Sequence, residues 1–214
     1  MKYWLFSILT AALAYCFGSL STLVLASNFS FHTNLKRLGE GNVWLSNFRR
    51  VYGVKGILKL ALIEIVKDAV PIIIGGWLFS SGDNAVAGRA LAAFCLIIGR
   101  MYPAIYEFRG GYATAGIVIG AMLISFSLGL AVLVAVVAAT LVSRYIAVGS
   151  LAGALALGAI AILMIENSVA MRLCIFIALL MFVRTLPALM RIAAKKEPKL
   201  SFKEDISYKF DEKF

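Results

Sequence analysis

The residues from Tyr112 to Val142 form an uninterrupted run of 31 residues without a charged side chain. As one α-helix this run would be about 46 Å long, at 1.5 Å per residue. The apolar core of a bilayer is about 30 Å thick, so the run is too long for one ordinary span and too short for two full spans. The sequence therefore predicts a helical hairpin, with a short helix to about Ser125, a turn between Ser125 and Gly129, and a helix returning to Arg144.

The composition of the whole chain agrees with a membrane protein. Of its 214 residues 62% are hydrophobic and 15% are charged, and the mean hydropathy is +0.92. A soluble domain carries about 25% charged residues, so we predict an all-α polytopic membrane protein. The three cysteines (Cys16, Cys95 and Cys174) stand alone in apolar runs, and His32 is the single histidine. This pattern predicts no metal site and no cofactor, and it identifies no catalytic base.

The positive charges predict the orientation of the chain. The net charge is +10, and most Lys and Arg residues stand in polar segments and in the C-terminal tail. The positive-inside rule explains this layout better than nucleic-acid binding does. It predicts about seven transmembrane or re-entrant helices with the N-terminus outside and the C-terminus in the cytoplasm. We expect one membrane domain over residues 1–194, whose first helix (2–26) is retained rather than cleaved as a signal peptide, and a charged cytoplasmic tail over 195–214.

Three polar segments, residues 28–56, 99–111 and 143–150, fall on the predicted cytoplasmic face. Each combines arginine with glycine or asparagine, and backbone N–H groups beside a cation are a common way to hold phosphate. The second predicted span, residues 57–79, also contains Glu64, Lys67 and Asp68 on one helical face. Buried charges of this kind require partners, and Glu64 is a candidate partner for Lys67. The sequence thus predicts a phosphate-handling site at a membrane surface.

Four blocks of sequence, in order, resemble the motifs of one known family. The blocks are A-Y-C-F-G-S-L-S (14–21), L-G-E-G-N-V-W-L-S-N-F-R-R-V-Y-G (38–53), G-R-M-Y-P-A-I-Y-E-F-R-G-G (99–111) and R-Y-I-A-V-G-S-L (144–151). They are similar to A-Y-L-L-G-S-I-P, V-G-S-G-N-x-G-A-T-N-x-x-R-x-x-G, G-H-x-F-P-x-F-x-x-F-K-G-G and R-Y-V-S-L-A-S-L of the PlsY family. These bacterial membrane acyltransferases move an acyl chain from acyl phosphate to the 1-position of glycerol 3-phosphate. Lys67 and Pro71 also match the family's D-x-x-K-G-x-x-P, in which Glu64 replaces the Asp, and K-E-P-K-L (196–200) resembles T-E-P-K-L.

The resemblance implies an enzyme of phospholipid biosynthesis in the bacterial plasma membrane, with its active face in the cytoplasm. It implies acyl phosphate and glycerol 3-phosphate as substrates, lysophosphatidic acid as product, membrane lipid as the surroundings, and direct transfer without an acyl-enzyme. The acyl chain would lie in a groove facing the bilayer. The residues implied to bind substrate or phosphate are Ser19, Gly41, Asn42, Asn47, Arg50, Lys67, Arg109, Gly110, Gly111, Arg144 and Ser150.

Eight of these residues have a more specific implied role. Arg50, Arg109, Arg144 and Lys67 would anchor phosphate. Asn42 and Asn47 would orient the substrates, and Ser19 or Ser150 would contact the acceptor. The acceptor's own phosphate would be available to take the proton. The resemblance indicates no oligomeric state.

Several motif positions depart from the family pattern. Glu40 replaces Ser, Trp44 replaces Gly, Arg100 replaces His, Arg109 and Tyr112 replace two Lys, Ala113 replaces Gly, and Thr185 and Ala188 replace His and Asn of a final-helix R-H-R-x-N pattern. These departures leave a second hypothesis open, an inactive or regulatory relative that binds a phosphorylated lipid or metabolite. A small transporter or structural subunit is a third hypothesis. Transport is disfavoured because the last three predicted helices carry almost no polar groups through the middle of the membrane.

Overall fold

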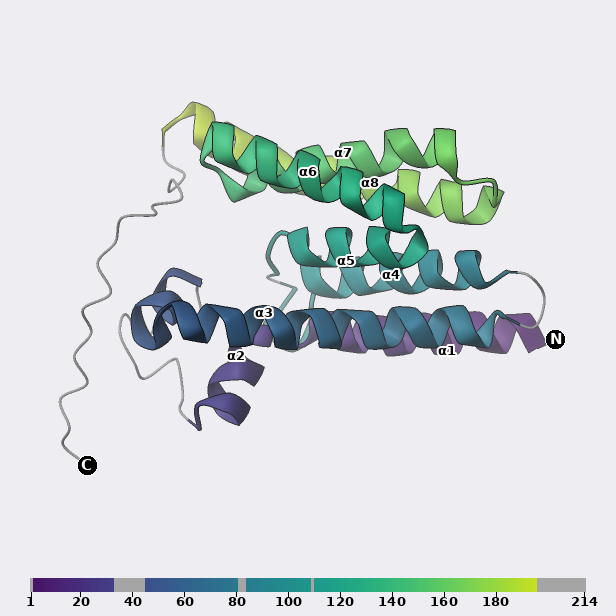
Figure 1. Cartoon of the computed structure of the whole chain (residues 1–214), viewed down its shortest axis with the longest axis horizontal. Helices are drawn as coiled ribbons and strands as arrows, with labels where there is room; N and C mark the ends of the chain where they lie inside the picture. Colours follow the sequence, from purple (N-terminus) through teal and green to yellow (C-terminus); the bar gives the residue numbers. More distant parts are fainter. Residues whose placement is uncertain (1, 33–44, 81–83, 109, 196–214) are drawn as a thin grey trace. The chain divides into compact units, whose positions relative to one another are not determined.

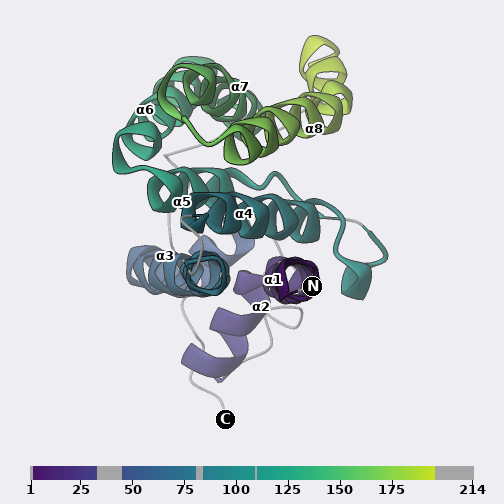
Figure 2. The same cartoon turned by 90° about the vertical axis from the view of Figure 1, so that its right-hand side faces the viewer.

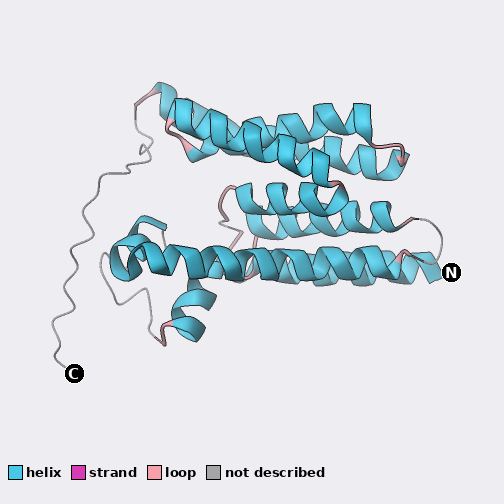
Figure 3. Cartoon of the chain, viewed as in Figure 1, coloured by secondary structure: helices cyan, strands magenta, loops and turns pink. Residues whose placement is uncertain are grey.

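The computed structural model describes residues 2–32, 45–80, 84–108 and 110–195. In these ranges the chain consists of helices joined by short loops, and no strand occurs among them (Figure 3). The predicted all-α class is confirmed. The described residues divide into two compact units, one formed by residues 2–20 and 67–195, and one formed by residues between Ser21 and Val66.

The larger unit contains six whole helices and the end of a seventh. They are α1 (Lys2–Ser19), α4 (Ala85–Met101), α5 (Thr114–Ile124), α6 (Phe126–Ser143), α7 (Ile146–Met164), α8 (Ser168–Ala193) and the part of α3 (Leu45–Leu78) from Lys67 onward (Figure 1). Within this unit α4 and α5 form a middle layer, with α1 on one side and α6, α7 and α8 on the other (Figure 2).

Glycines bring α1 and α4 into backbone contact. A Cβ atom on Gly18 would lie 2.2 Å from the carbonyl oxygen of Leu96, and one on Gly99 would lie 2.4 Å from the carbonyl oxygen of Tyr15. Small residues at such crossings let membrane helices pack closely where no hydrophobic force drives them together. The two glycines therefore set the separation between the end of α1 and the end of α4, where the site lies.

The predicted hairpin in the uncharged run is confirmed. Helix α5 ends at Ile124 and α6 begins at Phe126, and Ser125 between them is extended, with φ −152° and ψ 131°. The turn is one residue long, shorter than the predicted span from Ser125 to Gly129. A Cβ on Gly129 would lie 2.3 Å from the Met122 side chain. The glycine thus allows α6 to fold back tightly on α5.

Four described helices are long and apolar enough to cross a membrane: Ala85–Tyr106, Phe126–Ser143, Ile146–Met164 and Ser168–Ala193, where the first continues past α4. A fifth is present if α1 and the short helix α2 (Thr22–Leu25) count as one broken span. Helix α5 has only 11 residues, and α3 carries Lys67 and Asp68 in its apolar half. The protein is therefore an integral membrane protein, and the count of seven and the orientation of the termini stay predictions.

The smaller unit contains α2, a π-helical turn (Ala26–Ser30) and the first part of α3. Its core is aromatic: the Phe31 and Tyr52 rings stack with centroids 4.0 Å apart, and Phe48 meets Phe31 edge-on at 5.9 Å. Lys59 Nζ lies 5.2 Å from the Phe31 ring centroid, which is a cation–π geometry. Helix α3 changes direction at Gly53, whose φ of 64° favours glycine.

Three predicted boundaries are corrected by the structure. The first helix, predicted over residues 2–26, ends at Ser19. The polar segment 28–56, predicted as a loop, is helical from Leu45. In the segment 143–150 only Arg144 and Tyr145 lie between helices, because α7 begins at Ile146. Positive charge and turn residues marked these segments as polar, but they did not distinguish a loop from a polar helix end.

Candidate functional site

The loop that follows α4 is held to α1 by one tyrosine. The Tyr15 hydroxyl donates to the carbonyl oxygen of Tyr102 at 2.9 Å and accepts the N–H of Ala104 at 3.2 Å. The loop then makes a 3-10 turn over Ala104–Tyr106, and both Glu107 and Phe108 have left-handed backbones, with φ of 53° and 60°. These contacts hold the start of a reversal that leads into Gly110 and Gly111, called here the glycine turn.

The two residues of the glycine turn have different surroundings. A Cβ on Gly110 would lie 2.1 Å from the carbonyl oxygen of Arg100 and 2.5 Å from that of Met101, whereas a Cβ on Gly111 would meet no atom within 4 Å. Gly110 is thus packed against the end of α4 where no side chain fits. Gly111 is exposed and stands three residues before α5 begins at Thr114.

Helix α8 reaches the glycine turn through Arg184. Its Nη2 donates to the carbonyl oxygen of Gly110 at 2.7 Å, and its guanidinium carbon lies 5.8 Å from the Tyr102 ring centroid. Arg191, two turns further along α8, donates to the Tyr112 hydroxyl at 3.4 Å. The last helix therefore contacts the loop on both sides of Gly111.

Helix α7 contacts the start of α5 through two hydroxyls. The Oγ1 of Thr114 and the Oγ of Ser150 share a short hydrogen bond, and the Ser150 hydroxyl donates to the carbonyl oxygen of Ile146 at 2.8 Å. Ser150 is fully buried. The structure therefore places this predicted site residue beneath the glycine turn, where it joins α5 to α7.

Three charged residues meet at the end of α1 and are called here the charge triad: Lys67, Asp68 and Arg100. Asp68 Oδ2 accepts a hydrogen bond from Arg100 Nη1 at 3.1 Å, and Asp68 Oδ1 lies 3.3 Å from Lys67 Nζ. Lys67 Nζ also donates to the carbonyl oxygens of Leu20 at 3.1 Å and Phe17 at 3.4 Å. With all three groups ionised the triad carries one net positive charge. The predicted burial of Lys67 with a partner is confirmed, and the ion partner that the structure gives it is Asp68.

Ser19 lies between the two carbonyls that Lys67 binds. Its side chain is 3% exposed, and its Oγ has no hydrogen-bond partner among the described residues. A Cβ on Gly99 would lie 3.1 Å from the Ser19 backbone nitrogen. Buried hydroxyls are usually hydrogen-bonded, so the Ser19 hydroxyl is open to another molecule, as is the Nε of Arg184 among the other described site residues.

Arg100 connects the charge triad with the glycine turn. Its guanidinium binds Asp68, and its carbonyl oxygen packs against Gly110. The structure therefore brings together five of the predicted residues: Ser19, Lys67, Gly110, Gly111 and Ser150. Arg144 ends α6 with a left-handed backbone, φ 62°, and an exposed side chain.

The other predicted residues fall outside this group. Gly41, Asn42 and Arg109 lie outside the described residues, as do Glu40 and Trp44 among the departures. Asn47 and Arg50 lie in the first part of α3, in the smaller unit, and their side chains are likewise outside the described part. Among the residues that the structure does describe, no group of three or more His, Cys, Asp or Glu side chains is placed to hold a metal ion.

Three residues of the site were not predicted from the sequence. Arg184 and Thr114 hold the glycine turn, and Tyr15 fixes the loop before it. Arg184 carries a signal that could have revealed it, because a charge in the middle of an apolar helix usually marks a functional contact. Thr185 and Ala188, the final-helix departures, are both buried, and the Thr185 hydroxyl bonds back to the carbonyl oxygen of Met181.

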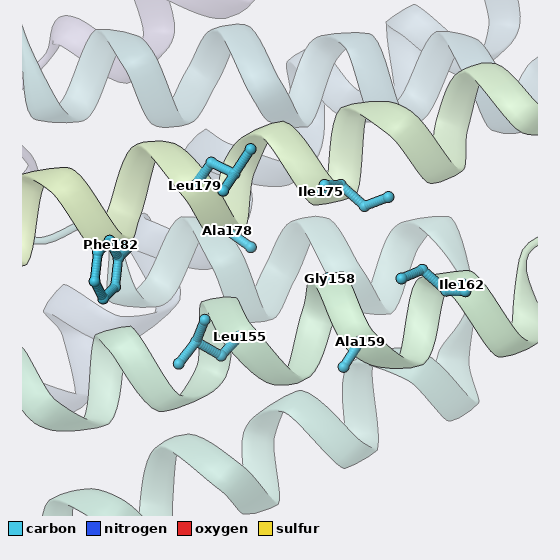
Figure 4. A pocket seen from close by; sticks show the side chains of 8 residues that line it. All are labelled: Leu155, Gly158, Ala159, Ile162, Ile175, Ala178, Leu179 and Phe182. Carbon is cyan, nitrogen blue, oxygen red and sulfur yellow. The ribbon is translucent and has the colours of Figure 1, made fainter.

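An apolar groove of 390 Å³ runs between α7 and α8. Leu155 and Phe182 lie at one end of it and Ile162 and Ile175 at the other, with Gly158 giving the groove its depth between them (Figure 4). Phe182 precedes Arg184 by two residues, and Leu155 follows Ser150 by just over one turn. Along the axes of α7 and α8, the end lined by Leu155 and Phe182 is therefore the end nearer to Ser150 and Arg184.

Comparisons with known proteins agree with this architecture. Residues 8–195 match the model of the glycerol-3-phosphate acyltransferase family. A glycerol-3-phosphate acyltransferase of Cereibacter sphaeroides is 29% identical over 196 residues, which cover 92% of this chain and 90% of that protein. One from a Thermoanaerobacter species is 27% identical over 149 residues, covering 70% of this chain and 73% of that protein.

The fold is also that of a solved enzyme. Crystal structures of PlsY, an integral membrane glycerol 3-phosphate acyltransferase, in its glycerol 3-phosphate and lysophosphatidic acid forms, superpose with TM-scores of 0.70 and 0.71 at 20% identity. They cover 91% and 90% of this chain, and 96% and 94% of theirs. With the family model spanning nearly the whole membrane region, the chain belongs to the glycerol-3-phosphate acyltransferase family.

Proposed function

We propose that this protein transfers an acyl chain from acyl phosphate to the 1-hydroxyl of glycerol 3-phosphate, in the plasma membrane of a bacterium, with its active face in the cytoplasm. The 1-oxygen of the acceptor bonds to the acyl carbonyl carbon, and the bond from that carbon to the phosphate oxygen breaks. Lysophosphatidic acid and inorganic phosphate leave, and phosphate takes the proton of the hydroxyl. The observation that carries the proposal is the glycine turn, held between α4 and Arg184 in a member of this family.

The phosphate of a substrate would bind at Gly111. Its backbone is exposed and precedes the start of α5, and helix N-termini favour anions through their free N–H groups and dipole. Arg50, Arg109 and Arg144 would supply the charge-assisted contacts, which are the strong ones for phosphate. Asn42 and Asn47 would orient the substrates, and Gly41 would offer a backbone N–H to phosphate.

The acceptor hydroxyl would bind at Ser19. Support comes from its buried, unpaired Oγ and from the net positive charge of the triad beside it. We assign Ser150 to the support of the glycine turn, since its hydroxyl already bonds to Thr114 and Ile146. Lys67 is likewise assigned to structural support, because its ammonium already contacts the carbonyl oxygens of Phe17 and Leu20 and the Asp68 carboxylate.

The acyl chain would lie in the groove between α7 and α8. The groove is apolar, and its Leu155–Phe182 end is the end nearer along the two helices to Ser150 and Arg184. Burial of a methylene group contributes about 0.8 kcal/mol, so a long chain gains affinity there that a short one does not. The reacting carbonyl would then stand at the Phe182 end of the groove.

Growth of a bacterial strain that is depleted of its own acyl-phosphate-dependent acyltransferase tests the function. Wild-type protein is expected to restore growth. Arg50→Ala and Arg109→Ala should not, while Arg172→Ala, on the exposed start of α8, should restore it. Failure of wild-type protein that is present in the membrane at normal amounts would contradict the proposal and favour a relative that binds a phosphorylated lipid without turnover.

A further inference from the structure

Two departures from the family motifs contact each other. In the pattern D-x-x-K-G-x-x-P, Lys67 stands at the Lys and Asp68 therefore occupies the position of the Gly. In the pattern G-H-x-F-P, Arg100 occupies the position of the His. Asp68 on α3 and Arg100 on α4 are 32 positions apart, and they form an ion pair in which Asp68 Oδ2 lies 3.1 Å from Arg100 Nη1. The motif patterns quoted above have a carboxylate at neither position, so both the acid and its counter-ion depart from those patterns.

Burial makes each of the two charges depend on the other. The Asp68 side chain is 0% exposed and that of Arg100 is 14% exposed. A buried charge without its partner is strongly destabilising, because neither water nor another ion replaces the lost contact. Without Asp68, Arg100 would lose the ion pair that balances its charge in α4, and without Arg100, Asp68 would keep Lys67 as its counter-ion.

Lys67 connects the Asp68–Arg100 ion pair to the end of α1. Its ammonium binds the carbonyl oxygens of Phe17 and Leu20 and faces Asp68 Oδ1. The last carbonyls of a helix have no partner within the helix, and a cation there is favourable. Ser19 lies between these two carbonyls, so the position of its hydroxyl follows from the position of the Lys67 ammonium.

We propose that Arg100 is a positioning residue rather than a phosphate ligand: it neutralises Asp68, which keeps Lys67 on the carbonyls that end α1 and so holds Ser19 in the site. This inference rests on the proposed function for the role of Ser19. The ion pair also accounts for the joint replacement of the motif Gly and the motif His, because Asp68 and Arg100 occupy these two positions. The two substitutions compensate each other and neither is tolerated alone.

A double-mutant cycle tests the inference in the full-length purified protein. The variants are D68N, R100Q and D68N/R100Q, with R172Q as the matched control on an exposed arginine. The catalytic measurement is kcat/KM with palmitoyl phosphate and glycerol 3-phosphate, expressed per folded protein. Hydrogen exchange of the peptide around residues 15–22 reports the end of α1 without requiring turnover.

R100Q is expected to lower kcat/KM at least tenfold and to raise exchange at the end of α1 at least tenfold. D68N/R100Q should recover to within threefold of wild type in both measurements, because the Asp68 carboxylate is then no longer present to draw the Lys67 ammonium away from the carbonyl oxygens of Phe17 and Leu20. R172Q should match wild type. A phosphate ligand would behave differently: the double variant would be as inactive as R100Q, and exchange in R100Q would stay at the wild-type rate. Either of these results would overturn the inference.

The family residues provide a second test. R100H leaves Asp68 without its arginine and should lose activity, and D68G/R100H should regain at least tenfold over R100H. Wild-type protein that is inactive with every donor would contradict the proposed function, and the exchange measurements would still decide whether Arg100 holds the end of α1. Active wild type with no recovery in D68G/R100H and in D68N/R100Q would contradict the inference alone.

Discussion

The guanidinium of Arg184 donates a hydrogen bond of 2.7 Å to the carbonyl oxygen of Gly110, 74 positions earlier in the chain. The same guanidinium lies over the Tyr102 ring. One side chain in the last apolar helix thus fixes both the start and the end of the loop that follows α4. The contact is to a backbone atom, so it determines the shape of the glycine turn without using the side chains of the turn.

Replacing Arg184 with Met should lower kcat/KM for acyl transfer by about 10- to 100-fold. A hydrogen bond to a charged group contributes about 1.5–3 kcal/mol, and each 1.36 kcal/mol in the activation free energy is about tenfold in rate. Steady-state kinetics with purified protein measures the change, and Arg172→Met is the control. A loss of twofold or less in R184M would show that the glycine turn keeps its shape without the arginine.

Alanine should lower activity far more at Gly110 than at Gly111, the two residues of the glycine turn. In Gly110→Ala the new methyl group would meet the carbonyl oxygens of Arg100 and Met101, so the turn must move, and we expect activity to fall at least about 100-fold, which is about 2.7 kcal/mol in the activation free energy. Gly111→Ala adds its methyl group to open space, so the turn keeps its shape; because the methyl group borders the proposed phosphate position, we expect activity to fall by about tenfold or less. Neither glycine has a positive φ, so backbone strain does not obscure the comparison. Equal effects at both positions would contradict this account of the turn.

Ser150→Ala should affect stability more than catalysis. The variant loses the hydrogen bond between α5 and α7 and leaves the Thr114 hydroxyl without it, which should lower the free energy of unfolding by about 1 kcal/mol. Because Ser150 is assigned to support, the KM for glycerol 3-phosphate should stay within about twofold of wild type. Thermal unfolding in detergent and acceptor titration measure the two quantities. A rise of KM by tenfold or more at unchanged stability would return Ser150 to the acceptor site.

Ala159→Trp should shorten the acyl chains that the protein accepts. Ala159 lines the groove between α7 and α8 and is exposed, so an indole can enter the groove without disturbing the core. We expect transfer from palmitoyl phosphate to fall at least about tenfold, equivalent to losing about 1.4 kcal/mol of transition-state binding, while transfer from octanoyl phosphate is retained. Val134→Trp, on the exposed face of α6, is the control. An equal loss of transfer from both donors, or no loss from either, would show that the acyl chain binds elsewhere.

The sequence was sufficient to predict the helical architecture because length and charge constrain helices in a membrane. The run from Tyr112 to Val142 had to fold back, and the structure breaks it at Ser125 as predicted. Boundaries were less predictable where polar residues continue a helix, as at Leu45 and Ile146. In such places the same arginines and glycines suit either a loop or a helix end.

The site was predicted as a set of residues but not as a set of contacts. Family motifs pointed to Ser19, Lys67 and the glycine turn, which the structure brings together. The pairing of Asp68 with Arg100 could not be predicted, because local spacing on α3 offered Glu64 to Lys67 and gave no information about α4. Arg184 was detectable as a charge in an apolar helix, but its partner could not be predicted, because that partner is a backbone carbonyl oxygen.

The most direct test of the central claim is acyl transfer by the purified full-length protein in lipid or detergent. Radiolabelled glycerol 3-phosphate is offered with palmitoyl phosphate, and in parallel with palmitoyl-CoA and with palmitoyl acyl-carrier protein. We expect labelled lysophosphatidic acid, acylated at the 1-position, from palmitoyl phosphate, with one inorganic phosphate released for each product formed. Folded protein that yields no lysophosphatidic acid with any of the three donors would contradict it.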